Sequence, residues 1–185
     1  MASIVQKDDP VLRQIAEEVP EEMIQSPKIG AVLKRMKAAL DAQDDGVAIA
    51  APQIGETLRI FIVSKHIFEL PEDAAREENA GGKKIKKKLV GHLVFINPRL
   101  TKLSKEKAPM EEGCLSVRYL YGKVERSVKA AVEAYDERGK KFSRGAAGLL
   151  AQIFQHEMDH LDGVLFIDKA RDVKDMPPEN NNRQQ

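Results

Sequence analysis

Three residues that can bind a metal ion stand at two places in the second half of the chain. Cys114 lies in Glu-Glu-Gly-Cys-Leu-Ser (111–116), while His156 and His160 lie in Gln-His-Glu-Met-Asp-His (155–160). The second segment contains His-Glu-x-x-His, a spacing that directs two imidazoles of one helix toward one metal ion. Three protein ligands leave a position for water, which is typical of a catalytic site. The sequence therefore predicts a mononuclear metal site.

A helix over residues 149–161 would bring these groups together. Each residue turns a helix by roughly 100°, so, relative to His156, His160 falls near 40° and Glu157 near 100°. The same arc carries three apolar side chains, Leu149, Leu150 and Ile153. The imidazoles therefore face the core, where a metal would satisfy their nitrogens and would bind the cysteine as its thiolate.

Three ordered motifs of this chain resemble those of the peptide deformylases. They are Gly-Val-Ala-Ile-Ala-Ala-Pro-Gln (46–53), Glu-Gly-Cys-Leu-Ser (112–116) and Gln-His-Glu-Met-Asp-His (155–160). The resemblance covers almost the whole chain, except for about 66–90 and the last dozen residues. The first motif departs from the family at Ala48, where a second glycine is usual, and the added methyl group could narrow the approach of a substrate backbone.

The resemblance implies an enzyme, a metal-dependent hydrolase that removes the N-formyl group from the N-terminal formyl-methionine of nascent polypeptides and releases formate. A metal-bound hydroxide would attack the formyl carbon, with Glu157 as general acid and base. The family's oxyanion donors correspond to the Gln53 side-chain amide and the Leu115 backbone N–H. The metal implied is Fe²⁺ in the cell, although a Cys-His-His donor set also suits Zn²⁺, Ni²⁺ or Co²⁺ in purified protein.

The resemblance also implies that the N-formylmethionyl peptide lies as an added strand along the backbone of the first motif. Its methionine side chain would enter an apolar pocket. The substrate-binding candidates are Gly46, Val47, Ala48, Ile49, Gly113, Ile153 and Phe154. Ile153 and Phe154 also have an ordinary interpretation as core residues of the helix.

Two other function classes remain open. A zinc peptidase shares His-Glu-x-x-His but usually recruits a carboxylate or histidine as third ligand, so Cys114 argues against it. A noncatalytic metal-binding or ribosome-associated relative would be expected to lose Glu157 or Gln53, and both are present. A lone cysteine is also often just a small buried residue, and a histidine pair alone gives false positives, so the three motifs together carry the argument.

Composition and charge exclude several partners. Thirty basic and twenty-nine acidic residues give a formal net charge of +1, so no global field favours DNA or an anionic membrane. One cysteine cannot form an intrachain disulfide, and the sequence contains neither a run of eighteen apolar residues nor an apolar N-terminal signal core. We therefore expect a cytoplasmic monomer.

The length of 185 residues, with 42% hydrophobic residues, fits one catalytic domain, which we place at 1–172. A long charged connection lies near 66–90, and we expect a disordered tail at 173–185. The connection contains a basic cluster, Lys83, Lys84, Lys86, Lys87 and Lys88. Its composition favours a solvated loop, and a transient contact with ribosomal RNA is the alternative.

Local patterns predict an α+β fold. Ser26-Pro27 begins an amphipathic helix that Asp45-Gly46 stops. The expected strands are 59–63, 89–97, 124–135 and a strand around Phe142, with a hairpin turn at 136–139.

The metal-binding helix over 149–161 should end near Gly163. The resemblance implies antiparallel or mixed sheets that surround this central C-terminal helix and bring Cys114 beside it. We also expect Arg126 to pair with Asp159 and to brace the helix.

Overall fold

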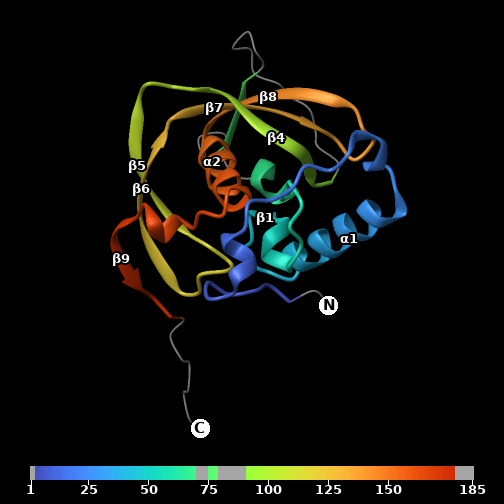
Figure 1. Cartoon of the computed structure of the whole chain (residues 1–185). Coiled ribbons are helices and arrows are strands. Elements are labelled where there is room, and N and C mark those ends of the chain that lie inside the picture. The colour runs from blue at the N-terminus through green and yellow to red at the C-terminus, as the bar shows by residue number, and fades with distance from the viewer. Residues whose placement is uncertain (1–2, 70–74, 79–90, 178–185) are drawn as a thin grey trace.

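Two antiparallel β-sheets surround helix α2 (Leu149–Leu161) in the computed structural model, which describes residues 3–69, 75–78 and 91–177. The larger sheet has six strands in the order β1-β2-β4-β7-β8-β3, and the smaller has three in the order β5-β6-β9. Figure 1 shows α2 near the middle of the molecule, with β4, β7 and β8 above it and β5 and β6 beside it. The predicted α+β class, with sheets around a C-terminal helix, is confirmed.

Within the described residues, nine strands are divided between the two sheets. The strands of the larger sheet are β1 (Ala48–Ala50), β2 (Ile60–Val63), β3 (Ala75–Glu78), β4 (Leu93–Leu103), β7 (Lys129–Tyr135) and β8 (Lys141–Gly148). Those of the smaller sheet are β5 (Lys107–Gly113), β6 (Leu120–Ser127) and β9 (Arg171–Asp175). Short 3-10 helices are η1 (Pro10–Arg13), η2 (Glu21–Met23), η3 (Ala51–Ile54), η4 (Lys65–Glu69) and η5 (Phe166–Asp168).

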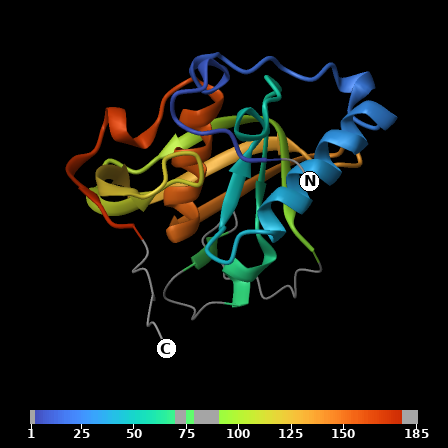
Figure 2. The ribbon, with the colours of Figure 1, turned by 90° about the horizontal axis from the view of Figure 1, so that it is seen from below.

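Strand β2 is buried on both faces, which explains its uninterrupted apolar sequence. Phe61 and Val63 contribute to the core cluster that contains α2, and Phe61 stacks on Phe95 with ring centroids 4.4 Å apart. Ile60 and Ile62 contribute to a second cluster that contains helix α1 (Pro27–Asp41). Figure 2 shows the two helices on opposite sides of these strands. The larger sheet therefore separates helix α2 from helix α1.

Helix α1 (Pro27–Asp41) begins as the sequence predicts and ends earlier. The Ser26 hydroxyl accepts a hydrogen bond from the Ile29 N–H at 3.3 Å, and proline occupies the first turn, where its missing N–H costs nothing. The helix ends at Asp41, four residues before Asp45, and the intervening residues form the loop that leads into β1. Within the described ranges, no helix is long and apolar enough to cross a membrane.

The single strand predicted over 124–135 is wrong, because the structure divides it between the two sheets. β6 ends at Ser127 and β7 begins two residues later, with Val128 between them. The Val128 N–H donates to the Glu106 carbonyl at 3.1 Å. Gln155 of α2 binds both the N–H and the carbonyl of Ser127, at 3.0 and 2.9 Å. The apolar alternation continues through this turn, so the sequence alone gave no sign of it.

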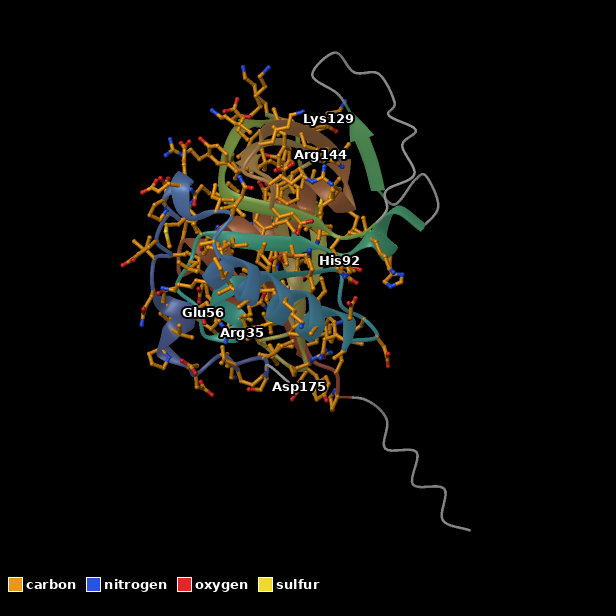
Figure 3. All side chains as sticks on the ribbon, turned by 90° about the vertical axis from the view of Figure 1, so that its right-hand side faces the viewer. Arg35, Glu56, His92, Lys129, Arg144 and Asp175 are labelled. Atoms are coloured by element: carbon orange, nitrogen blue, oxygen red, sulfur yellow. The ribbon has the colours of Figure 1, made fainter. Side chains whose placement is uncertain are left out.

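The predicted end of the ordered domain at 172 is also wrong. Strand β9 crosses that boundary and pairs with β6, with Leu120 opposite Asp175, so the beginning of the predicted disordered tail at 173–185 is an ordered strand. Figure 3 labels Asp175 at the end of this strand. All five residues of β9 are exposed, so backbone pairing rather than apolar burial holds the strand, and the sequence carries little signal for it. Residues 178–185 of the predicted tail lie outside the described residues.

The other predicted elements fall close to their expected positions. The turn at 136–139 joins β7 to β8. The N–H of its last residue, Gly139, donates to the Asp136 carbonyl at 2.9 Å. The strand predicted at 89–97 corresponds to β4. In the connection near 66–90, the described part includes β3, which pairs with β8. The basic cluster of this connection lies outside the described residues.

The metal-binding helix ends in a glycine turn at the predicted position. The Gly163 N–H donates to the His160 carbonyl at 3.2 Å, and the Val164 N–H donates to the Asp159 carbonyl at 2.9 Å. This pair of bonds, with Gly163 at a φ of +73°, is the Schellman arrangement. A Cβ atom at this position would lie 2.7 Å from the Arg13 carbonyl oxygen. The end of α2 is therefore fixed against the N-terminal segment.

Replacing Gly163 by alanine should destabilise the protein by roughly 1–3 kcal/mol, because a left-handed backbone and a backbone clash would both oppose the new methyl group. Gly30→Ala in α1 is the matched control, since a Cβ there meets nothing within 4 Å. That change should stabilise the protein by up to about 1 kcal/mol through helix propensity. Urea unfolding of both variants measures the difference, and equal effects would contradict the argument.

Candidate metal centre

The structure brings the three predicted ligands together. The Cys114 Sγ lies 3.1 Å from the His160 Nε2, and the ligand atoms of Cys114, His156 and His160 all lie within 4.8 Å of one another. The two imidazole rings are 5.0 Å apart, as expected for i, i+4 positions of one helix. A thiolate with two imidazoles suits a borderline divalent ion, so the donor set fits the predicted metal.

The cysteine reaches the histidines because β5 runs beside α2. β5 ends at Gly113, directly before Cys114. The Gln152 side chain of α2 donates to the Glu111 carbonyl of β5 at 2.8 Å. This hydrogen bond therefore joins the end of β5 to α2, one turn before His156.

A buried ion-pair network orients the first histidine, and its central member, Glu112, is not among the predicted site residues. The His156 Nδ1–H donates to the Glu112 carboxylate at 2.9 Å, which leaves Nε2 for a metal. Arg126 binds both oxygens of Glu112, at 2.7 and 3.0 Å. The same guanidinium binds Asp159 at 2.7 Å, so the predicted contact between Arg126 and Asp159 is present. The signal in the sequence that could have identified Glu112 is its position directly before the Gly-Cys pair.

Electrostatics in this network favour the charged forms of Glu112 and Cys114. Burial by itself would raise the pKa of Glu112, but hydrogen bonds from His156 and Arg126 lower it to about 2. Burial would likewise raise the pKa of the Cys114 thiol, yet the neighbouring His160 and His156 lower it to about 5. The cysteine is therefore poised as a thiolate near neutral pH.

Glu157 lies beside the ligands without a fixed partner. Its side chain is buried, and its Oε2 has no hydrogen-bond partner among the described residues. Burial raises the pKa of Glu157 to about 7, against the opposing effect of His156 and His160. A carboxyl group with this pKa can accept and return a proton near neutral pH.

Gln53 is held in place by its own loop and points toward the cysteine. Its Oε1 accepts a hydrogen bond from the Ala50 N–H at 2.8 Å. Its Nε2 lies 3.2 Å from the Ser116 hydroxyl and 3.6 Å from the Cys114 sulfur. The fixed oxygen leaves the amide nitrogen as the group that faces the site. The Leu115 N–H, on the other side, donates to no acceptor within the described part of the chain.

The loop that carries Gln53 is braced from outside. Glu56 follows η3 and forms an ion pair with Arg35 of α1, and Figure 3 shows these two side chains close together. Gly46 lies on the other side of β1, in the loop from α1, where a Cβ atom would come within 2.9 Å of the Leu40 side chain. Close packing against α1 therefore explains Gly46, which does not line the site pocket.

A pocket of about 270 Å³ opens onto the candidate site. Four of the predicted substrate-binding residues line it: Val47, Ala48, Gly113 and Ile153. Ala48 lies in β1 with an ordinary strand backbone, so its methyl group needs no strained φ. The Tyr121 ring covers Gly113, where any Cβ would lie 2.6 Å from the ring.

The structure places two other candidates away from the pocket. Ile49 is fully buried in the cluster that contains α1. Phe154 is fully buried against the rings of Phe61 and Phe95, with centroid distances of 6.2 and 5.3 Å. The α2 face that carries Phe154 packs on the larger sheet, so this side chain belongs to the core rather than to the pocket lining.

Comparisons with known proteins agree with one another. The family described as polypeptide deformylase matches residues 1–176. A peptide deformylase of Psychrobacter cryohalolentis is 38% identical over 171 residues, which cover 92% of this chain and 80% of that protein. A chloroplastic peptide deformylase 1A of Solanum lycopersicum is 37% identical over 172 residues, which cover 91% of this chain and 59% of that protein.

Solved structures of similar proteins share the fold. The peptide deformylase of Thermotoga maritima superposes with a TM-score of 0.74 at 30% identity, over 92% of this chain and 98% of that one. A Met-Ala-Ser-bound class I type b peptide deformylase of Acinetobacter baumannii gives a TM-score of 0.73 at 29% identity, over 91% and 99% of the two chains.

Zinc or cobalt should stabilise the metal-free protein, because the folded state gathers three ligands that the unfolded chain separates. At a metal concentration 100 times Kd, the expected gain is about 2.7 kcal/mol, seen as a rise in Tm. Cys114→Ala should lose most of this gain. His92→Gln should keep it, because His92 binds Asp41 and the Lys65 backbone rather than the ligands. A full metal-induced shift in the cysteine variant would argue against the site.

Acid should remove the contribution of Glu112 to stability. The folded-state pKa is depressed from the model-compound value of 4.5 to about 2, so this contribution is present above about pH 4.5 and is lost as the pH falls through about 2. In metal-free protein, Glu112→Gln should cost about 3 kcal/mol at pH 7, and the gap to wild type should close toward pH 2. Urea midpoints across pH measure this, with the exposed Glu125→Gln as control. A gap that does not change with pH would contradict the assignment.

Proposed function

This chain belongs to the polypeptide deformylase family, and we propose from this premise that it hydrolyses the N-formyl group of formyl-methionyl nascent peptides and releases formate. The observation that carries the proposal is one pocket in which a Cys-His-His ligand set, a buried Glu157 and the Gln53 amide converge. A formyl group is small enough to enter such a site ahead of the peptide. The same groups serve attack on a carbonyl carbon, protonation of the leaving nitrogen and stabilisation of an oxyanion.

The residues that would hold the metal are Cys114, His156 and His160. When bound there, a divalent ion would polarise a water molecule and lower its pKa toward about 7. Glu112 keeps the ring of His156 in the orientation that leaves Nε2 free, since it accepts the Nδ1–H.

Glu157 is the proposed proton carrier. Its burial raises the pKa to about 7, and its Oε2 has no partner within the described residues, so the carboxylate can accept the proton of the attacking water. It then returns this proton to the peptide nitrogen, because an unprotonated amide nitrogen is a poor leaving group. The free N-terminus and formate result.

Gln53 and Leu115 are the proposed oxyanion donors. The Ala50 N–H fixes the oxygen of the Gln53 amide, so the amide nitrogen faces the cleft without having to reorganise. The Leu115 N–H follows the cysteine directly and has no acceptor among the described residues. The two donors come from opposite walls of the pocket. The distance between the Gln53 amide nitrogen and the Leu115 N–H decides how well both donors fit one oxyanion.

The peptide would extend the larger sheet. β1 is an edge strand that pairs only with β2 in the described part of the chain, so its outer edge is open to an extended segment. Val47, which is 40% exposed, precedes this edge and lines the pocket. Leu149 and Ile153 of α2 give the pocket an apolar wall for the methionine side chain. A similar protein has been solved with Met-Ala-Ser bound, which supports a peptide substrate.

The remaining parts of the proposal concern the cellular setting. We expect Fe²⁺ as the metal in the cell, with Zn²⁺, Ni²⁺ or Co²⁺ as substitutes after purification, and a cytoplasmic monomer. Contact with the ribosome through the basic cluster at 83–88 stays a separate prediction. Metal analysis after anaerobic purification, paired with activity, tests the first point, because ferrous iron beside a thiolate is open to oxidation.

Formate release tests the proposed reaction. Metal-loaded protein should release formate from formyl-Met-Ala-Ser amide and should leave the acetyl analogue intact. It should also leave an unformylated peptide with internal amide bonds intact, which separates a deformylase from a peptidase. Metal-loaded protein that releases no formate would overturn the proposal.

Glu157→Gln should keep the metal and lose turnover by about 10²–10⁴-fold, because the change removes proton transfer without removing a ligand. The fall should appear in kcat rather than in KM. Metal content and Tm provide the check that the site is intact. Glu133→Gln in β7, whose side chain is 45% exposed and pairs with Lys141, is the control and should keep wild-type rates. Wild-type turnover in the Glu157 variant would exclude its role.

A further inference from the structure

A short segment near the start of the chain, residues 4–6, binds both walls of the catalytic pocket. The Val5 N–H donates to the Gln53 carbonyl at 3.0 Å. The Gln6 side-chain Nε2 donates to the Leu115 carbonyl at 3.2 Å. Gln53 lies in η3, directly after β1 of the larger sheet, while Leu115 follows β5 of the smaller sheet. This segment, which we call the N-terminal strap, therefore joins the two residues that carry the oxyanion donors.

The N-terminal strap is itself held by the rest of the chain. Ile4 packs against the cluster that contains α1, and Val5 packs against the cluster that Cys114 also contacts. The Gln6 carbonyl accepts a hydrogen bond from the Asp9 N–H at 2.8 Å, so a turn fixes its backbone. The Gln6 amide nitrogen lies 3.4 Å from the Ile4 carbonyl as well, which gives both of its hydrogens an acceptor. The Gln6 side chain therefore has a fixed backbone and a defined orientation.

The carbonyl that Gln6 binds belongs to a peptide group whose other end points at a metal ligand. The Ser116 N–H is the donor of this same peptide group, and it donates to the Cys114 Sγ at 3.4 Å. The carbonyl and the N–H of one planar trans peptide point in opposite directions, so a bond to the carbonyl also fixes the N–H. Hydrogen bonds in such a chain polarise one another. Gln6 therefore acts on the cysteine sulfur through one peptide group.

The peptide group before it carries the Leu115 N–H. Its carbonyl, that of Cys114, accepts a hydrogen bond from the Val117 N–H at 3.0 Å, so the Leu115 N–H points the opposite way. The two peptide groups meet at the Leu115 Cα. Fixing both planes fixes the backbone dihedral angles of Leu115, and Gln6 holds the second plane from outside the loop. The direction of the Leu115 N–H therefore depends on the Gln6 bond.

The opposite wall is held by the neighbouring residue of the strap. The Gln53 backbone is bound by the Val5 N–H, and its side-chain oxygen is bound by the Ala50 N–H at 2.8 Å. Val5 and Gln6 are consecutive, so their Cα atoms are about 3.8 Å apart across a trans peptide. Covalent geometry of the strap thereby links the position of Gln53 to that of Leu115.

The strap lies outside the surface that a substrate would contact. Among the described residues, the pocket lining includes Gln53 and Leu115 but none of residues 4–6. Gln6 is exposed to solvent. A change in the strap therefore alters the arrangement of the donors rather than the surface that binds the peptide. Oxyanion donors act in the transition state, where the charge develops, so such a change should appear in kcat rather than in KM.

We propose that the N-terminal strap clamps the oxyanion site and that Gln6 is a positioning residue. Gln6 holds the peptide group between Leu115 and Ser116, so that the Leu115 N–H faces the oxyanion while the Ser116 N–H faces the Cys114 sulfur. The inference rests on the proposed function, because it concerns the same reaction. Removing the Gln6 donor releases this peptide group and leaves the metal ligands and the pocket lining in place. The loss of one such hydrogen bond corresponds to about twofold to tenfold in kcat.

The test uses Gln6→Met in cobalt-loaded protein, because methionine keeps the side-chain length without the donor. The kcat for formyl-Met-Ala-Ser amide should fall about twofold to tenfold, with KM unchanged. The cobalt–thiolate charge-transfer band should also shift, since the hydrogen bond to the sulfur tunes the ligand. Gln6→Lys keeps a donor that can reach the same carbonyl and should restore most of kcat. A purely structural role would instead lower Tm and leave kcat and the band of the folded protein unchanged.

The matched control is Gln14→Met, at a second exposed glutamine of the N-terminal part of the chain. The Gln14 side chain makes no hydrogen bond within the described ranges, so this variant should keep the wild-type kcat and the wild-type band. A wild-type kcat or an unshifted band in Gln6→Met would overturn the inference alone, because formate would still be released. Cobalt-loaded wild type that releases no formate would instead overturn the proposed function, and the inference with it.

Discussion

The candidate site depends on the bonds that the buried Glu112 carboxylate forms with its neighbours. The carboxylate comes from β5, its guanidinium partner Arg126 comes from β6, and His156 comes from α2. A buried charge is tolerated only where such partners surround it, so the three elements can pack in one arrangement. That arrangement also places Cys114, two residues after Glu112, against the second histidine. The metal ligands are thus positioned by a network that lies behind them.

Two glutamines perform a related task where the backbone leaves regular structure. Gln155 binds both polar groups of Ser127 at the point where the chain passes from one sheet to the other. Gln53 binds the Ala50 N–H just after β1 and thereby turns its amide nitrogen toward the cysteine. Both side chains are buried, and each satisfies a backbone group that no ladder partner reaches. In Gln53, the amide oxygen accepts the structural hydrogen bond, whereas the amide nitrogen has the proposed role as oxyanion donor.

The pocket is a seam between two sheets rather than a hollow in one. Gln53 and β1 lie on the wall of the larger sheet, while Cys114 and Leu115, which follow β5, lie on the wall of the smaller one. Helix α2 contacts both sheets, through β7 and β8 on one side and β6 on the other. The separation of the two sheets therefore also sets the distances between the reacting groups.

The sequence by itself determined helix α2 and its glycine end, because helical periodicity and capping are local and involve residues close in the chain. It also singled out the candidate ligands Cys114, His156 and His160, which the structure brings together. It also indicated the family, through three ordered motifs. The tertiary structure decided the break at Val128, the ordered strand β9 and the core position of Phe154, since apolar alternation does not say which sheet or face a residue joins. It alone revealed Glu112 as the partner of His156. Contacts between residues 44 positions apart depend on how strands and helix pack, and no local pattern encodes that packing.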